Sequence, residues 1–122
     1  DDRLRETLPI DDGLPMSLAS LKNPPDPGTK PDYSLPTLIK LAILGSPHKR
    51  LTLQEIYLAL EDRFQWFKDN THDKAWKNSI RHNLSLRKCF LRVQRPMTEP
   101  GKGAFWTVDP SQGEGNKRER KR

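Results

Sequence analysis

The sequence predicts a small α+β domain in which three helices precede an antiparallel β-hairpin. Apolar residues recur at helical spacing between residues 34 and 85, and they alternate at strand spacing from residue 89 onward. The chain has only 33% apolar residues and 11 prolines in 122 residues, so a core of about 80–90 residues is expected. We expect a disordered acidic, Pro-rich leader over residues 1–29, one domain over residues 30–111 and a flexible basic tail over residues 112–122.

The first expected helix begins near Ser34, a good N-cap because its hydroxyl can accept a hydrogen bond from the first turn. Pro36 falls in that turn, where its missing N–H group is harmless. The segment Gly45-Ser46-Pro47 is expected to end the helix. The apolar residues that share one face of it are Leu35, Leu38, Ile39, Ala42 and Ile43.

The second expected helix starts at Thr52, because Thr52 and Glu55 have the spacing of a capping box. Its apolar stripe consists of Leu53, Ile56, Tyr57, Leu60 and Phe64. Residues 64–75 are expected to link this helix to the third, with Trp66 and Phe67 closing the core.

The third expected helix, about residues 75–85, separates apolar and polar side chains onto opposite faces at about 100° per residue. The buried face is expected to consist of Trp76, Ile80 and Leu84. The opposite face carries Asn78, Arg81, His82 and Ser85. Asn, His and Ser are weaker helix formers than the Glu, Lys and Gln of an ordinary solvated face.

This polar face lies in a stretch suited to a polyanion, since residues 75–95 contain no acidic side chain. Their basic residues are Lys77, Arg81, Arg87, Lys88, Arg92 and Arg95. Such a surface attracts a phosphate backbone, and the Asn78 amide can pair with N6 and N7 of adenine in the major groove. His82 can donate to a base or touch a thymine methyl, and Arg81 can reach a base or a phosphate. Ordinary surface residues are the alternative interpretation.

The pattern changes after the third helix. Cys89, Leu91 and Val93 alternate with polar residues, as in a half-buried strand, and residues 104–109 form a second β-prone run. The loop between them, residues 96–103, is rich in Pro and Gly. Three helices followed by a hairpin with a basic loop tip predict a winged helix-turn-helix.

The charge distribution also favours a polyanion partner. The net charge is +6, but residues 1–29 carry three basic and six acidic side chains, whereas residues 30–122 carry 19 basic and 10 acidic ones. The basic tail residues are Lys117, Arg118, Arg120, Lys121 and Arg122. A cluster of this kind predicts nuclear import, or phosphate or minor-groove contacts beyond the wing.

Several classes of protein are disfavoured. Cys89 is the only cysteine, which fits a reducing compartment, and His48, His72 and His82 are too scattered for a metal site. We expect no membrane span, signal peptide, cofactor, metal or small-molecule substrate. An enzyme is disfavoured because His82 has no nearby acid in sequence to orient it. The absence of heptads predicts a monomer on DNA.

The quoted elements together resemble the forkhead family of transcription factors. The likeness covers about residues 30–110, and "WKNSIRHNLSL" and "EPGKGAFW" are its most specific parts. It implies a winged helix whose third helix enters the major groove of an A/T-rich TGTTT or AAACA site. It places base contacts on Asn78, Arg81 and His82. It implies backbone contacts at Tyr33, Ser85, Leu86, Lys102 and Trp106, to which the charge pattern adds Lys77 and Arg87.

The segment "KCFLRV" and the wing are most similar to the J class of the family. The chain departs from the usual pattern at Asp32, Leu35, Pro36 and Arg87, and "FQWF" lacks a Pro that usually precedes the third helix. Three alternatives stay open: an architectural winged helix that binds DNA without sequence preference, a protein-interaction winged helix, and a forkhead domain that reads a GC-containing motif.

Overall fold

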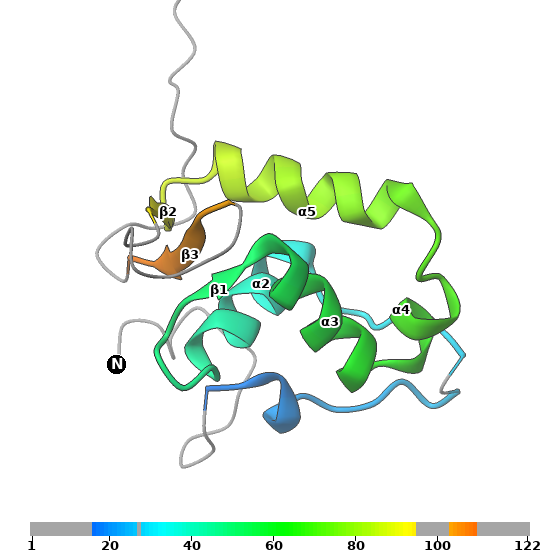
Figure 1. Cartoon of the computed structure of the whole chain (residues 1–122). Coiled ribbons are helices and arrows are strands. Elements are labelled where there is room, and N and C mark those ends of the chain that lie inside the picture. Colours follow the sequence, from blue (N-terminus) through cyan, green and yellow to red (C-terminus); the bar gives the residue numbers. More distant parts are fainter. Residues whose placement is uncertain (1–15, 27, 95–102, 110–122) are drawn as a thin grey trace, which may run out of the picture.

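The computed structural model describes residues 16–26, 28–94 and 103–109, and it has the winged-helix arrangement that the sequence predicts. A short 3-10 helix, η1 (Leu18–Ser20), precedes the helices α2 (Leu35–Leu44), α3 (Leu53–Arg63), α4 (Gln65–Asp69) and α5 (Lys74–Leu86). The strands are β1 (Leu51–Thr52), β2 (Phe90–Val93) and β3 (Phe105–Val108). In Figure 1, α5 runs along one edge of the molecule, with α2 and α3 beneath it and the sheet at one end.

The ends of α2 and α3 are fixed by the local signals in the sequence. The Ser34 side chain accepts a hydrogen bond from the N–H group of Thr37, which caps α2. Thr52 and Glu55 form both hydrogen bonds of the capping box, of 2.9 and 3.2 Å, which confirms the predicted start of α3.

The segment between α3 and α5 contains a helix that the sequence did not predict. Helix α4 has only five residues. It is separated from α3 by Phe64 alone, which is both the C-cap of α3 and the N-cap of α4. A hydrogen bond of 2.7 Å from the Gln65 amide to Asp69 spans α4, and the Asn70 amide donates to the carbonyl of Trp66. The expected core contribution is confirmed for Phe67, which is fully buried, and Trp66 packs against the core.

The hairpin belongs to a three-stranded antiparallel sheet in the order β1-β3-β2. Strand β1 has two residues and was not predicted. The sequence predicted that Cys89, Leu91 and Val93 face the core. This prediction is wrong for Leu91, which is 43% exposed, whereas Phe90 is fully buried. Burial instead falls on the adjacent pair Cys89 and Phe90, where the chain leaves α5 and turns into the sheet.

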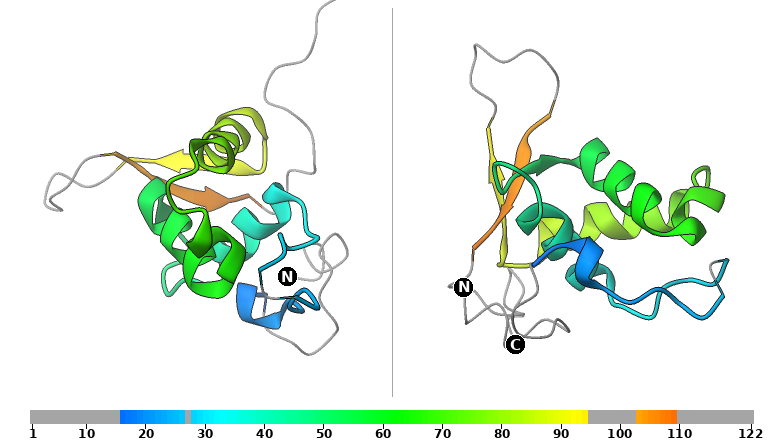
Figure 2. Two further views of the ribbon diagram at one scale, coloured as in Figure 1. Left: turned by 90° about the vertical axis from the view of Figure 1, so that its right-hand side faces the viewer. Right: turned by 90° about the horizontal axis from the view of Figure 1, so that it is seen from below.

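The core lies where α2, α3 and α5 meet, and the sheet closes one end of it (Figure 2). The following side chains are fully buried or nearly so: Leu38, Ile39, Leu41, Ile43, Ile56, Leu60, Phe64, Phe67, Ile80, Leu84 and Phe90. The predicted stripes of the three helices supply most of this set.

The segment of residues 16–26, which we call the N-terminal strap, packs across α2 and α3. Leu18 and Leu21 of the strap are 7% and 4% exposed and belong to the main core cluster. The expected disorder over residues 1–29 therefore does not hold for the strap, because two leucines three residues apart reach the core. Residues 1–15 lie outside the described part of the chain.

Candidate nucleic-acid interface

Helix α5 is fixed to the rest of the domain by its inner face. Asp73 caps its first turn by accepting a hydrogen bond of 2.9 Å from the N–H group of Ala75. The Trp76 ring packs edge-on against Tyr57 and Phe67 at centroid distances of 5.6 and 4.8 Å, and its indole N–H donates to the carbonyl of Asn70. Trp76, Ile80 and Leu84 are the three buried residues of α5, as predicted.

The outer face of α5 presents the candidate base-reading residues to solvent. Asn78, Arg81, His82 and Ser85 are all exposed. Their spacing places them on the side of the helix opposite the buried stripe. The structure thus brings together the three residues for which base contacts are expected, on a helix that cannot rotate without exposing Trp76 and Ile80.

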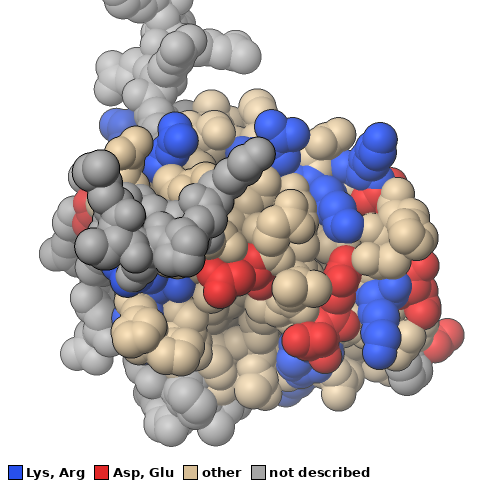
Figure 3. Space-filling model, viewed as in Figure 1, with Lys and Arg blue, Asp and Glu red and all other residues tan. Residues whose placement is uncertain are grey.

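Basic side chains gather along the edge of the domain that α5 forms. Helix α5 contains Lys74, Lys77 and Arg81 and no acidic residue, although its N-cap is Asp73. Figure 3 shows Lys and Arg side chains along the edge that α5 forms, whereas most Asp and Glu side chains of this view lie below it. The outer face of α5 therefore belongs to a surface that attracts anions.

Lys77 lies on the inner flank of α5 and not beside Asn78 and His82. Its ammonium donates to the carbonyl of Thr71 and lies 3.8 Å from the carboxylate of Glu61. It also lies 5.4 Å from the centroid of the Tyr57 ring. A contact from Lys77 to phosphate would have to replace these interactions within the domain.

The end of α5 is closed by side chains of its own last turns. The Asn83 amide donates to the carbonyl of Ser79, and the Arg87 guanidinium donates to the Asn83 side chain at 2.8 Å. Arg87 and Leu86 are half-buried, whereas Ser85 is exposed. The backbone N–H of Arg87 also donates to the carbonyl of Asn83, so the candidate backbone contacts Ser85 and Leu86 lie in the last turn of α5 and Arg87 is its C-cap.

The other expected backbone contacts lie on different elements. Tyr33 precedes the N-cap of α2, is half-buried, and its hydroxyl accepts a hydrogen bond of 3.1 Å from the N–H group of Lys22. Trp106 lies in the central strand β3, half-buried and opposite Arg92 of β2. Lys102 and the five basic tail residues lie outside the described residues.

Arg92 is a candidate that the site prediction missed. It is exposed on β2, and the strand register places it directly opposite Trp106. The available signal was its position as an outward residue of the first predicted strand, but the pairing with Trp106 depends on the sheet register. Arg92 thus places a cation opposite Trp106, a candidate backbone contact.

One titratable group near the interface has a shifted pKa. Burial raises the pKa of the Tyr57 phenol above its ordinary value of 10.0, and the nearby Arg81 charge partly opposes this shift. The Tyr57 hydroxyl donates to the carbonyl of Lys77 at 3.2 Å. Tyr57 therefore stays neutral near pH 7 and connects α3 to the inner flank of α5.

Two further kinds of site are absent from the part of the chain that the structure describes. Among the described residues, no three His, Cys, Asp or Glu side chains gather into a group that could hold a metal ion. Within the same part of the chain, no helix has both the length and the apolar character needed to cross a membrane.

Comparisons with known proteins identify the family. The model of the forkhead domain matches residues 29–117. The chain is 51% identical over 82 residues to forkhead box protein F1-B of Xenopus laevis, an alignment that covers 67% of this chain and 22% of that protein. It is 46% identical over 99 residues to forkhead box protein F2 of Mus musculus, covering 81% of this chain and 21% of that protein.

A third relative, forkhead box protein I3-A of Danio rerio, is 49% identical over 82 residues, or 67% of this chain and 23% of that protein. The chain thus spans about a fifth of the length of the curated relatives it matches. These relatives carry F-class and I-class names, so the likeness to the J class stays a prediction. The family match covers α2 to β3 and includes every candidate residue of the interface except the end of the tail, and the chain belongs to the forkhead family.

Proposed function

We propose that this chain is the sequence-specific DNA-binding domain of a forkhead transcription factor, with α5 in the major groove of an A/T-rich site. One observation carries the proposal above the others. Asn78, Arg81 and His82 are exposed together on an acid-free helix whose opposite face is buried in the core. A rigid helix that presents an amide, a guanidinium and an imidazole suits direct readout of base edges.

The proposed roles follow from the chemistry of each group. Asn78 pairs with N6 and N7 of an adenine, and His82 donates to a base acceptor or contacts a thymine methyl. Arg81 reaches a base or a neighbouring phosphate. Together these contacts would select a TGTTT or AAACA core, as the family resemblance implies.

Backbone contacts would supply most of the salt-dependent affinity. The proposed backbone contacts are Tyr33, Ser85, Leu86, Arg87, Lys102 and Trp106. Lys77 is also proposed, but it would first have to leave Thr71 and Glu61. The basic tail, from Lys117 to Arg122, would add contacts to phosphates or the minor groove. The same cluster would direct the protein to the nucleus, and the domain would bind DNA as a monomer.

The test is a selection from randomised duplexes with the whole chain at about 150 mM salt, a concentration at which non-specific contacts are weakened. Affinity is then measured on the selected duplex and on a scrambled one. Enrichment of an AAACA core, with a specific-to-random affinity ratio above about 10³, is the expected result. Enrichment of a GC-containing motif would keep the function and change the site.

An architectural winged helix is the second candidate, because the positive surface of α5 and the tail would bind any duplex. It predicts tight binding without enrichment of any sequence. That result would reduce Asn78 and His82 to ordinary surface residues.

A further inference from the structure

Helix α3 reaches α5 through side chains, at the part of α5 that lies away from the sheet. Helix α5 packs closely against α2 and β2, whereas the backbones of α3 and α5 stay farther apart. In Figure 1 the N-terminal end of α5 lies toward α4, and its C-terminal end leads into β2. The part of α5 up to Arg81 carries two of the proposed base-reading residues, Asn78 and Arg81 itself. Contacts from α3 therefore bear on how these two residues are held.

Three residues connect α3, the turn after α4, and α5. The Lys77 ammonium lies 3.8 Å from Oε2 of Glu61 and donates to the carbonyl of Thr71. The Thr71 hydroxyl donates to the same Oε2 of Glu61 at 2.7 Å. Each residue thus contacts the other two, and we call Glu61, Thr71 and Lys77 the Glu61 triangle. A closed network of this kind can be worth more than its separate pairs.

The Glu61 triangle is partly shielded from water, so its charges are less screened than those of an open surface pair. The side chains of Lys77 and Glu61 are 27% and 15% exposed. The Lys77 ammonium also lies 5.4 and 5.5 Å from the ring centroids of Tyr57 and Trp76, at a distance where a cation is attracted to an aromatic face. Lys77 would lose these contacts by turning to a phosphate, so they favour a role within the domain.

Tyr57 adds a second link from α3 to the same turn of α5. Its hydroxyl donates to the carbonyl of Lys77 at 3.2 Å, and its ring packs edge-on against Trp76. Lys77 directly precedes Asn78 in the chain. The helical turn from Lys77 to Arg81 is therefore tied to α3 at its first residue, through both the side chain and the backbone.

We propose that Glu61 is a positioning residue for DNA readout. It holds Lys77, and through Lys77 the turn of α5 that carries Asn78 and Arg81, in a fixed place relative to α3. Base edges have to be met at one position and in one direction, whereas phosphates attract cations with much less geometric demand. Loss of the triangle should therefore weaken binding to the selected duplex more than to the scrambled one. This inference rests on the proposed function, because it explains how the base-reading residues are presented.

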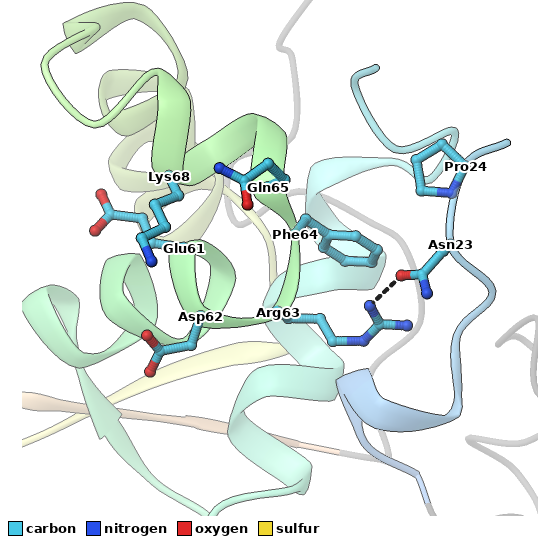
Figure 4. A pocket seen from close by; sticks show the side chains of 8 residues that line it. All are labelled: Asn23, Pro24, Glu61, Asp62, Arg63, Phe64, Gln65 and Lys68. Atoms are coloured by element: carbon cyan, nitrogen blue, oxygen red, sulfur yellow. Dashed lines mark hydrogen bonds between the residues drawn. The ribbon is translucent and has the colours of Figure 1, made fainter. Parts of the chain in front are cut away.

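The test compares Glu61→Gln with Asp62→Asn, a matched control, in the full chain. Each change removes one negative charge and keeps the size of the side chain. Asp62 is exposed, and no hydrogen bond or ion pair joins its carboxylate to another described residue. Figure 4 shows the two neighbours at the edge of a cleft of about 260 Å³, with their carboxylates pointing apart. Lys77→Met, which removes the ammonium, is the second test variant.

Affinity is measured on the selected and the scrambled duplex over a range of salt, at a temperature where circular dichroism finds each variant folded. We expect Glu61→Gln and Lys77→Met each to lower the selected-to-scrambled affinity ratio about two- to fivefold, the range of one ion pair. The double variant should lose no more than Lys77→Met, because both changes act through one interaction. Asp62→Asn should keep the ratio of the wild type.

Two results would overturn the inference. One is an unchanged ratio in both Glu61→Gln and Lys77→Met. The other is a gain of affinity on both duplexes with a steeper salt dependence in Glu61→Gln, because that result would mean that Glu61 restrains a lysine that otherwise binds phosphate.

The place of α5 can also be measured without DNA, which separates this inference from the proposed function. Residual dipolar couplings of backbone amides report the orientation of α5 relative to α2 and α3. Those of residues 75–81 should change in Glu61→Gln and Lys77→Met but not in Asp62→Asn, and those of residues 83–86 should stay unchanged. Couplings identical to the wild type in both test variants overturn the positioning role. If they change but the wild type binds both duplexes equally, the positioning of α5 stands and sequence-specific readout fails.

Discussion

The inner and outer faces of α5 belong to one helix but are governed by different physical demands. Trp76, Ile80 and Leu84 are at most 4% exposed, and packing against α2, α3 and the sheet dictates their size and spacing. Asn78, Arg81 and His82 are exposed, and nothing in the packing of the domain calls for these residue types. The comparison teaches that periodicity locates the outer face, whereas packing within the domain does not account for its chemistry.

A large effect on stability is expected at the inner face. Ile80→Ala removes three buried carbon atoms and leaves a cavity, so the free energy of unfolding should fall by about 2–5 kcal/mol. Denaturant unfolding measures this loss. The ratio of specific to random DNA affinity should be unchanged where the variant is folded, and a changed ratio would mean that the two faces are not independent.

The complementary effect is expected at the outer face. Asn78→Ala should cost about 1–3 kcal/mol of binding free energy on the selected duplex and little on the scrambled one, because it removes a base contact. Thermal unfolding should be close to that of the wild type. Equal losses on the two duplexes would mean that Asn78 contacts the DNA backbone and does not read a base.

A smaller effect should distinguish the inner flank from the outer face. Lys77→Met removes the ion pair with Glu61 and should lower stability by about 1 kcal/mol, with little change in the salt dependence of binding. Arg81→Met should leave stability nearly unchanged. If Arg81 contacts a phosphate, its loss reduces the slope of log affinity against log salt by about one, and the slope is unchanged if it reads a base. A reduced slope in Lys77→Met would show that Lys77 leaves Glu61 to bind phosphate.

The smallest effect concerns pH and the contact between α3 and α5. Because burial raises the pKa of Tyr57, the folded state favours the neutral phenol, and stability is lost as the pH rises from about 10 through the folded-state pKa. Tyr57→Phe cannot ionise, so it should lose less stability over this alkaline range. Denaturant midpoints of both proteins across the range measure the difference, and parallel curves would contradict the assignment.

The sequence predicted the elements that carry strong local signals. Ser34 and the Thr52–Glu55 pair cap α2 and α3 as expected, and the stripe of Trp76, Ile80 and Leu84 is buried as expected. The same helical spacing predicted that Asn78, Arg81 and His82 are exposed. These features depend on residues within one or two helical turns of each other.

The features that were missed depend on distant partners. Strand β1 has two residues, too few for a sequence pattern, and exists because it pairs with β3. The strap is held by Arg63, some 40 residues away, so its leucines alone predicted nothing. Leu91 was assigned to the wrong side because the turn out of α5 buries both Cys89 and Phe90.

The pairing of β1 with β3 has a consequence for the order of folding. Its register joins Leu51 to Trp106 and Thr52 to Phe105, residues more than 50 positions apart. Closing so long a loop has a larger entropic cost than forming the contacts between the helices, which join segments that lie closer together in the sequence. We expect the three helices to associate before the central strand is captured. The helix proposed to read the bases would then be in place while the wing beside it is still unpaired.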